Sequence, residues 1–563
     1  MVSYNIAEKI RVELEEMIRN SIRGAQEEGE LPPFDVPVVP IEASRDRSHG
    51  DFATTVALTL ARSARMAPRA IATILAKRIS APCGYVERVE VAGPGFINFF
   101  LNRVWLEETL IMIEDAGTAY GTSDFGGGAR IQIEFVSANP TGPMNVVNAR
   151  AGAVGDTLAN IFAAAGYQVS REYYINDAGN QVDVLGKSVE LRYRQLLGEP
   201  VELSPECYQG DYITDLARRA LDERGRDIAS MSDDERRNFF KSYAVAEILR
   251  MQRESLRNFG VEFDVWFSEK TLEDSGADKQ VMEILDSKGL LYEKDGAIWF
   301  KSTAFGDDKD RVVVKRDGKY TYLLRDLAYH KNKLDRGFDR IIDIWGPDHH
   351  GYVARTKAGV QALGYPQDAL EVLLLQLVTL YSHGEQVRMS KRAGEFITMD
   401  ELIQEVGKDA ARYFFVMRNI DSHLDFDMEL AKEQSQENPV YYIQYAHARL
   451  SSIMRQAAEL GVKYVPAREA NLGLLAEDAE VELIKKLAAF PDEIIAAARD
   501  RAPNRIAKYA LDLAGMFHSF YNSYRVLSDD RELTAARLVL ANATRIVLRN
   551  LLGILGVSAP ERM

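Results

Sequence analysis

The first 115 residues of this 563-residue chain combine helical and strand-like hydrophobic patterns. Apolar residues near the start recur at the spacing of one helical face: Ile6, Ile10, Leu14 and Met17. Residues 51–65 predict a second helix, whereas 86–92 and 96–101 alternate around a Gly-Pro-Gly turn and predict two strands. We therefore expect a small α/β domain over residues 1–115.

A different pattern, from residue 120 to about 375, is typical of a nucleotide-binding fold. Residues 131–136 alternate as a strand, a Pro/Gly turn follows, and the small residues of 149–165 predict a helix. In such a unit, free N–H groups and the helix dipole can hold phosphate. A continuous apolar run, 341–345, predicts a further buried strand.

Residues 181–300 interrupt this domain. They are largely helical with acidic stretches, so we expect an insertion between two halves of the nucleotide-binding fold. The second half would resume with strands at 298–301 and 311–315 and a helix at 320–334. Residues 376–437 are expected to connect this domain to the next.

From residue 438 the pattern is helical without strands. Four amphipathic helices are predicted, over 440–457, 480–498, 505–527 and 534–555. With short connections they are expected to form a bundle over residues 438–563. The expected fold class is α/β multidomain, with a small α/β N-terminal domain, a Rossmann-type catalytic domain carrying an insertion, and a C-terminal all-α bundle.

Composition narrows the class of protein. The chain is 46% hydrophobic and 27% charged, which is ordinary for a soluble globular protein. Cys83 and Cys207 are far apart, so we expect neither a disulfide framework nor a protein-held metal. The acidic N-terminus lacks a signal-peptide pattern, and no run approaches the about 18 apolar residues of a membrane span. A cytoplasmic monomer without membrane contact is expected.

The net charge of −15 argues against a polyanionic partner over most of the surface. Residues 501–563 are different, because nine Lys and Arg stand there against five Asp and Glu. A locally basic helical region fits a nucleic acid that touches only part of the surface. Ordinary solvated helix faces explain the same count equally well.

Two short runs carry the candidate chemistry. Residues 137–150 read Ser-Ala-Asn-Pro-Thr-Gly-Pro-Met-Asn-Val-Val-Asn-Ala-Arg, and residues 388–392 read Arg-Met-Ser-Lys-Arg. Together they resemble the two signature motifs of class I aminoacyl-tRNA synthetases, and the surrounding residues resemble the arginyl-tRNA synthetases over essentially the whole chain. The resemblance implies arginine–tRNA ligase activity, with ATP, L-arginine and tRNA(Arg) as substrates and an arginyl-adenylate intermediate.

The resemblance assigns residues to ATP and to catalysis. Catalytic roles fall on Asn145, Asn148, Lys391 and Arg392, the last two as cations that stabilise departing pyrophosphate. ATP-binding positions are Pro140, Gly142, Asn145, Val147, Asn148, Gly346, Asp348, His349, Met389, Ser390 and Lys391. The chemistry also implies Mg²⁺ bound to the ATP phosphates.

The first motif departs from the family pattern of His-x-Gly-His. Asn145 and Asn148 can donate through their amides but cannot supply a charge-assisted hydrogen bond. Val147 adds a branched side chain where the family has glycine. A turn and helix cap without catalytic meaning is the competing interpretation, and a catalytically weakened tRNA-binding paralogue is the alternative function.

An arginine-binding box is predicted from carboxylates. Glu134 ends a strand just before the first motif, and Tyr322 and Asp326 share a helix face at i,i+4. Carboxylates are the expected partners of a guanidinium. The resemblance also assigns these three residues to arginine binding, and it adds Ser137 and Asn139 to the set. Each acid alone would more often form a surface ion pair.

Contacts to tRNA are expected at both ends of the chain. Tyr445 and Arg449 lie in a helix rich in aromatic residues, the means by which proteins bind unpaired bases and phosphate. A tyrosine-rich core stripe is the competing interpretation. The resemblance places both residues at the anticodon loop and residues 1–115 at the tRNA elbow.

Overall fold

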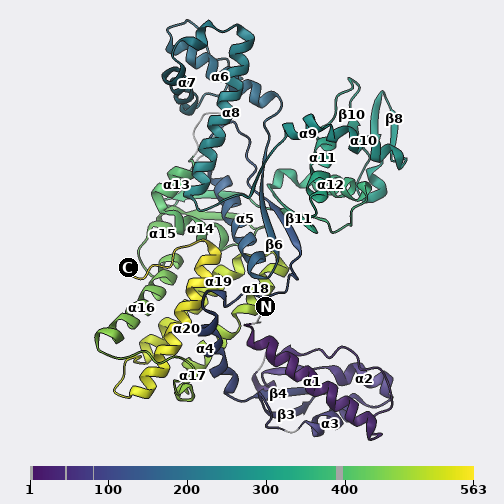
Figure 1. Cartoon of the computed structure of the whole chain (residues 1–563), viewed down its shortest axis with the longest axis vertical. Coiled ribbons are helices and arrows are strands. Elements are labelled where there is room, and N and C mark those ends of the chain that lie inside the picture. The colour runs from purple at the N-terminus through teal and green to yellow at the C-terminus, as the bar shows by residue number, and fades with distance from the viewer. Residues whose placement is uncertain (1–3, 45–46, 80, 388–396) are drawn as a thin grey trace.

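The computed structural model describes residues 4–44, 47–79, 81–387 and 397–563. The molecule is elongated: the N-terminal domain lies at one end, a helical unit at the other, and a parallel sheet and a helical bundle lie between them (Figure 1).

The N-terminal domain packs three helices on one antiparallel sheet. Its helices are α1 (Ile6–Glu27), α2 (Val56–Ala64) and α3 (Pro68–Arg78). The strands, in sheet order, are β1 (Glu42–Ala43), β2 (Phe52–Thr54), β4 (Phe96–Leu101) and β3 (Val86–Ala92). The predicted helix over 51–65 is wrong in its first turn, because Phe52 and Thr54 are buried in a strand that pairs with β4.

The predicted boundary at residue 115 places one helix in the wrong domain. Helix α4 (Val104–Ala116) contacts the C-terminal helices, and Leu110 and Ile113 are fully buried in the large core they share. The amphipathic pattern predicts that a helix buries one face but not which domain covers it.

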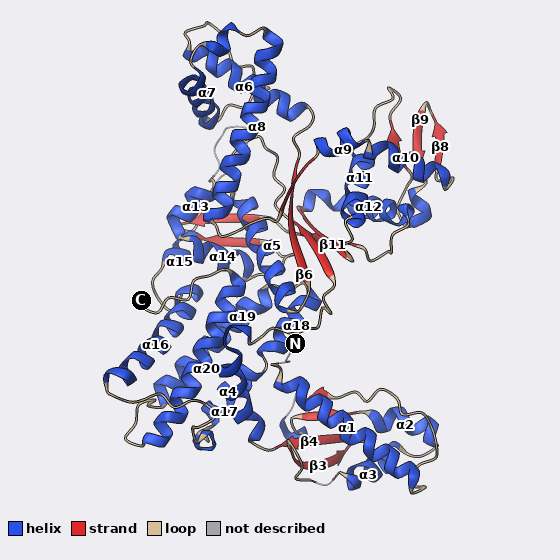
Figure 2. Ribbon diagram, in the orientation of Figure 1, coloured by secondary structure: helices blue, strands red, loops and turns tan. Residues whose placement is uncertain are grey.

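A five-stranded parallel sheet forms the centre of the molecule (Figure 2). Its order is β12 (Leu370–Leu374), β11 (Arg340–Trp345), β5 (Arg130–Glu134), β6 (Gln168–Ile175) and β7 (Val265–Ser268). Helix α5 (Val146–Ala164) packs on one face, and α11 (Tyr322–Asp335) and α12 (His350–Leu363) on the other. The strand order reverses between β5 and β11, where doubly wound sheets bind ligands.

The predicted insertion at 181–300 is divided in two by β7, which belongs to the central sheet. Before it, α6 (Asn180–Leu196), α7 (Asp211–Arg224) and α8 (Asp233–Asn258) form the helical unit. After it come α9 (Lys270–Ser275), α10 (Ala277–Ser287) and an antiparallel sheet of β8 (Leu291–Lys294), β9 (Ala297–Phe300) and β10 (Arg311–Val314). The strands predicted at 298–301 and 311–315 exist, but outside the nucleotide-binding sheet.

A second small sheet follows β12. It contains β13 (Val378–Ser382), β14 (Glu385–Gln386) and β15 (Leu424–Asp427), covered by α13 (Met399–Val406), α14 (Lys408–Val416) and α15 (Met428–Lys432). Thr398 and Glu401 form a reciprocal capping box at the start of α13.

The C-terminal bundle has five helices in place of the predicted four. They are α16 (Pro439–Glu459), α17 (Asp478–Ala488), α18 (Phe490–Asp500), α19 (Asn504–Ser523) and α20 (Arg531–Leu555). The predicted helix 480–498 is interrupted because Pro491 lies in the first turn of α18, where the missing N–H is tolerated. By length and composition α20 could cross a membrane, but 67% of its apolar stretch is buried in the molecule.

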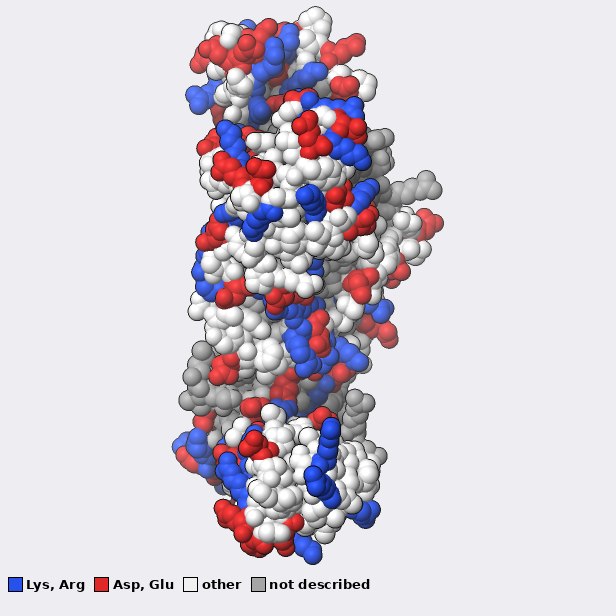
Figure 3. Space-filling view, turned by 90° about the vertical axis from the view of Figure 1, so that its right-hand side faces the viewer, with Lys and Arg blue, Asp and Glu red and all other residues white. Residues whose placement is uncertain are grey.

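Basic and acidic side chains are interspersed along the face shown in Figure 3, from one end of the molecule to the other. The excess of acidic side chains is therefore not concentrated at one end of this face.

Candidate active site

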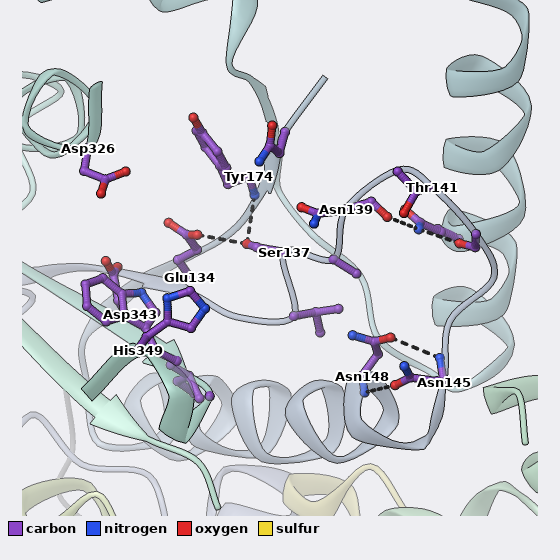
Figure 4. A pocket seen from close by; sticks show the side chains of 18 of the residues that line it. Glu134, Ser137, Asn139, Thr141, Asn145, Asn148, Tyr174, Asp326, Asp343 and His349 are labelled. Carbon is purple, nitrogen blue, oxygen red and sulfur yellow. Dashed lines mark hydrogen bonds between the residues drawn. The ribbon is translucent and has the colours of Figure 1, made fainter. Parts of the chain in front are cut away.

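A cavity of about 650 Å³ opens where the central sheet reverses its strand order. Predicted residues that line it are Glu134, Ser137, Asn139, Gly142, Asn145, Asn148, Tyr322, Asp326, Gly346 and His349. These positions span more than 200 residues of sequence. Asp326 lies across the cavity from Ser137 and Asn139, with Glu134 between them (Figure 4).

The turn after β5 has an unusual backbone. Val136 and Ser137 both have positive φ angles, 68° and 37°, which non-glycine residues seldom adopt. Ser137 compensates through its side chain, since its Oγ donates to Glu134 (2.9 Å) and accepts from the Tyr174 N–H (3.1 Å). Strain of this kind is retained where surrounding contacts over-determine it, as at binding sites.

Two of the pocket's carboxylates share a buried cation. Lys333 Nζ, fully buried on α11, lies 2.5 Å from Glu134 and 2.8 Å from Asp343. Burial alone would lower the pKa of Lys333, but these two carboxylates raise it, so the side chain stays charged. His330 Nε2 lies 2.8 Å from the other oxygen of Asp343.

The Asp326 carboxylate differs, because no described side chain donates a hydrogen bond to it. Burial raises its pKa to about 7; nearby His330 opposes the shift, and the Glu269, Glu134 and Asp343 carboxylates add to it. A desolvated acid without a counter-ion is a favourable site for a cationic ligand. Tyr322, one helical turn earlier, is 76% exposed at the rim.

The two asparagines of the first motif cap α5. Asn145 Oδ1 accepts from the N–H groups of Val147 (3.0 Å) and Asn148 (3.1 Å), and Asn148 Oδ1 accepts from the Asn145 N–H (3.0 Å). The prediction that these N–H groups are free for phosphate is therefore wrong. Because both oxygens are engaged, the two amide nitrogens remain the groups that can donate into the pocket.

Several predicted ATP-binding residues lie elsewhere. Pro140 is buried, Val147 is 38% exposed, and Asp348 is exposed; none of the three lines the cavity. Gly346 and His349 do line it, and His349 packs between the rings of Trp345 and Tyr352 (centroid distances 6.1 and 5.9 Å). The predicted Met389, Ser390, Lys391 and Arg392 lie outside the described residues.

Models of known families match nearly the whole chain. An "Arginyl tRNA synthetase N terminal domain" matches residues 5–101, "tRNA synthetases class I (R), catalytic domain" matches 113–442, and a "DALR anticodon binding domain" matches 443–563. The chain belongs to the arginyl-tRNA synthetases.

Curated arginyl-tRNA synthetases are similar along their full length. The arginine–tRNA ligase of Desulforamulus reducens is 51% identical over 558 residues, covering 99% of this chain and 100% of its own. That of Bacillus licheniformis is 48% identical over 564 residues, with the same coverage.

Solved structures agree. A putative arginyl-tRNA synthetase from Campylobacter jejuni superposes with a TM-score of 0.76 at 34% identity, covering 82% of this chain and 100% of its own. The Thermus thermophilus enzyme gives 0.73 at 22% identity over 98% of this chain and 100% of its own, which is a likeness of fold.

In this arginyl-tRNA synthetase the predicted tRNA-binding pair lies far from the cavity, on α16. The Arg449 guanidinium lies 4.6 Å from the centroid of the Tyr445 ring and 4.9 Å from that of Tyr521, and donates to the Tyr445 hydroxyl (2.7 Å). Both residues are partly exposed, so they are not a core stripe.

Sequence reasoning missed several pocket residues, among them Tyr174, Tyr212, Gln252 and Asp343, and also Lys333, which pairs with two of the lining carboxylates. Asp343 offered a signal, because it is the one charged residue in the apolar run 341–345. Tyr212 and Gln252 come from the helical unit and have no local pattern that points to a site. In the described part of the chain, no cluster of three His, Cys, Asp or Glu could hold a metal.

Proposed function

We propose that this chain joins L-arginine to tRNA(Arg) in two steps. The arginine carboxylate attacks the α-phosphorus of ATP, giving arginyl-adenylate and pyrophosphate. The terminal hydroxyl of the tRNA then attacks the arginyl carbonyl carbon, and AMP leaves. The observation that carries the proposal is the Asp326 carboxylate, which lines the cavity and accepts no hydrogen bond from a described side chain.

Arginine would bind with its guanidinium at Asp326. Lys333 neutralises much of the charge of Glu134 and Asp343. A bound cation would therefore stabilise the ionised form of Asp326 more than that of the other two carboxylates. Glu134 would act with Ser137 and Asn139 to shape the pocket, and Tyr322 would close its rim.

ATP would lie along the turn at Gly142 and against Gly346 and His349. Asn145 and Asn148 would donate their amides to the phosphates, in place of the family's charged donors. Lys391 and Arg392 would stabilise the pyrophosphate as it leaves. Mg²⁺ would arrive with ATP, held by phosphate oxygens, and would screen their charge.

The remaining partners follow from the domains. Tyr445 and Arg449 would contact the anticodon loop of tRNA(Arg), and the N-terminal domain would contact its elbow. We also propose that the protein acts in the cytoplasm as a monomer.

Aminoacylation of total tRNA with each of the twenty amino acids tests the proposal. Charging with arginine alone is the expected result. Charging with another amino acid would refute the arginine pocket, and binding of tRNA without any charging would favour the weakened paralogue.

A further inference from the structure

The turn that carries Asn139 and Gly142 is held by side chains from the helical unit. Gln252 Nε2 on α8 donates to the carbonyls of Asn139 (3.1 Å) and Gly142 (2.9 Å). The Tyr212 hydroxyl on α7 donates to the carbonyl between them, that of Thr141 (2.8 Å). Three of the four carbonyls in the turn 139–142 are therefore held by side chains from outside it.

The orientation of the Gln252 amide is itself fixed. The side chain is 1% exposed, and its Oε1 lies 3.1 Å from the Tyr173 hydroxyl. Because the oxygen is engaged there, both amide hydrogens face the turn. The packing is also close at Gly142, where an added Cβ would lie 3.3 Å from the Tyr212 hydroxyl oxygen.

The same helix contacts the segment that follows the second signature run. Ser255 lies three residues after Gln252, hence on the same face of α8, and its Oγ donates to Asp400 (2.5 Å). The neighbouring Met399 N–H donates to the carbonyl of Met144 (2.9 Å) in the first motif. Helix α8 thus contacts both the turn of the first motif and the start of α13, and α13 is itself bonded to the first motif.

We propose that the helical unit positions the turn 139–142, which carries the proposed ATP contact at Gly142. Tyr212 and Gln252 are the positioning residues, and Ser255 joins α8 to Asp400. The inference rests on the proposed function. Displacement of reacting groups by a fraction of an ångström costs rate, so a turn with strained neighbours gains from donors mounted on a rigid helix.

Tyr212→Phe tests the proposal, because it removes one hydroxyl and leaves the ring. We expect kcat/KM for ATP to fall about fivefold, the usual effect of one neutral hydrogen bond, with the arginine KM changed less than about twofold. Tyr193→Phe is the matched control: it removes a 2.8 Å bond from a tyrosine hydroxyl to the Gly225 carbonyl within the same helical unit. It should lose similar thermal stability and keep wild-type ATP kinetics.

Gln252→Glu is the second variant. It keeps the shape and the acceptor for Tyr173 but sets a carboxylate against two carbonyls, so kcat/KM for ATP should fall more than in Tyr212→Phe. Ser255→Ala should lower it by an amount similar to Tyr212→Phe. If Tyr212→Phe and Gln252→Glu lower the melting temperature and leave ATP kinetics at the wild-type value, their role is structural only and the proposal is overturned.

The dissociation constant of ATP, measured by isothermal titration, separates this inference from the proposed function. If the wild-type chain charges no tRNA, the proposed function fails, and weaker ATP binding in Tyr212→Phe but not in Tyr193→Phe would still support the positioning role. Equal ATP affinity in both variants and the wild type would overturn it.

Discussion

At the scale of single residues, the proposed arginine pocket holds carboxylates of two kinds. Glu134 and Asp343 share Lys333, whereas Asp326 has no described donor. Asp326→Asn should therefore raise the arginine KM about 30- to 100-fold, because a charge-assisted bond is lost. Glu134→Gln should raise it less than about tenfold, because that carboxylate is already paired. The ATP KM serves as the internal control in both variants, and equal effects on arginine and ATP would contradict the assignment.

The raised pKa of Asp326 makes a prediction about pH. In the free enzyme this carboxyl titrates near pH 7, because burial disfavours its charged form. Arginine needs the ionised form, so binding is complete above pH 7 and is lost as the pH falls through it. The arginine KM should rise about tenfold for each pH unit below that value. In Asp326→Asn this dependence should disappear; its persistence would assign the titration to another group.

Lys391 is predicted to act on the transition state. Lys391→Ala should remove about 2–4 kcal/mol of transition-state stabilisation in the activation step and leave the ATP KM nearly unchanged. Single-turnover formation of arginyl-adenylate measures this. A parallel loss of ATP binding would contradict a role confined to the leaving group.

At the scale of elements, the start of α5 combines a cap with a donor site. Asn145→Ala should lower the free energy of unfolding by about 1 kcal/mol, the usual cost of losing an N-cap, and should slow activation. Asn145→Ser keeps a capping oxygen but loses the amide, so it should slow activation without that cost in stability. Chemical denaturation and activation kinetics of the pair separate the two roles.

Restoring the family motif should increase the rate of arginine activation only slightly. The combined Asn145→His, Val147→Gly and Asn148→His variant would remove the reciprocal cap while adding charged donors, and we expect activation to rise less than about tenfold. A rise of a hundredfold, about 2.7 kcal/mol of barrier, would favour a decayed motif and the weakened paralogue.

Elements with a strong local period could be predicted from the sequence, and their partners could not. β5, α5 and β11 were predicted within a few residues, because alternation and small-residue runs are local signals. The membership of β7 in the central sheet, and of 298–301 in another sheet, depends on pairing with residues far along the chain. The same limit holds in the site, where Glu134 and Asp326 carry motif signals but the pairing of Lys333 with Glu134 bridges 199 residues.

At the scale of the whole molecule, the basic excess of the C-terminal region is partly consumed by the fold. Arg501 pairs with Glu371, Arg505 with Glu493, and the buried Arg537 with Glu480. The sequence count therefore overstates the charge available to a polyanion. This makes the partly exposed cations of α16, Arg449 and Arg455, the stronger candidates for contact with tRNA.

Arg449→Ala should raise the tRNA KM and leave the arginine and ATP KM values unchanged, because α16 lies in the bundle and lines no part of the cavity. If Arg449 contacts phosphate, the slope of log affinity against log salt should fall by about one. Arg455→Ala, which removes a cation further along the same helix, is the matched control. Equal effects in both variants would indicate a general loss of positive charge.

The reciprocal cap between Asn145 and Asn148 also constrains how the enzyme can evolve. Each asparagine oxygen accepts from backbone N–H groups at the start of the helix, so replacing Asn145 loses the bonds from Val147 and Asn148, and replacing Asn148 loses the bond from Asn145. Each step towards the histidine motif therefore leaves backbone N–H groups of the first helical turn without their side-chain acceptor. Among descendants of this chain, each of the two positions should therefore keep a residue with a capping oxygen, even where its surroundings drift.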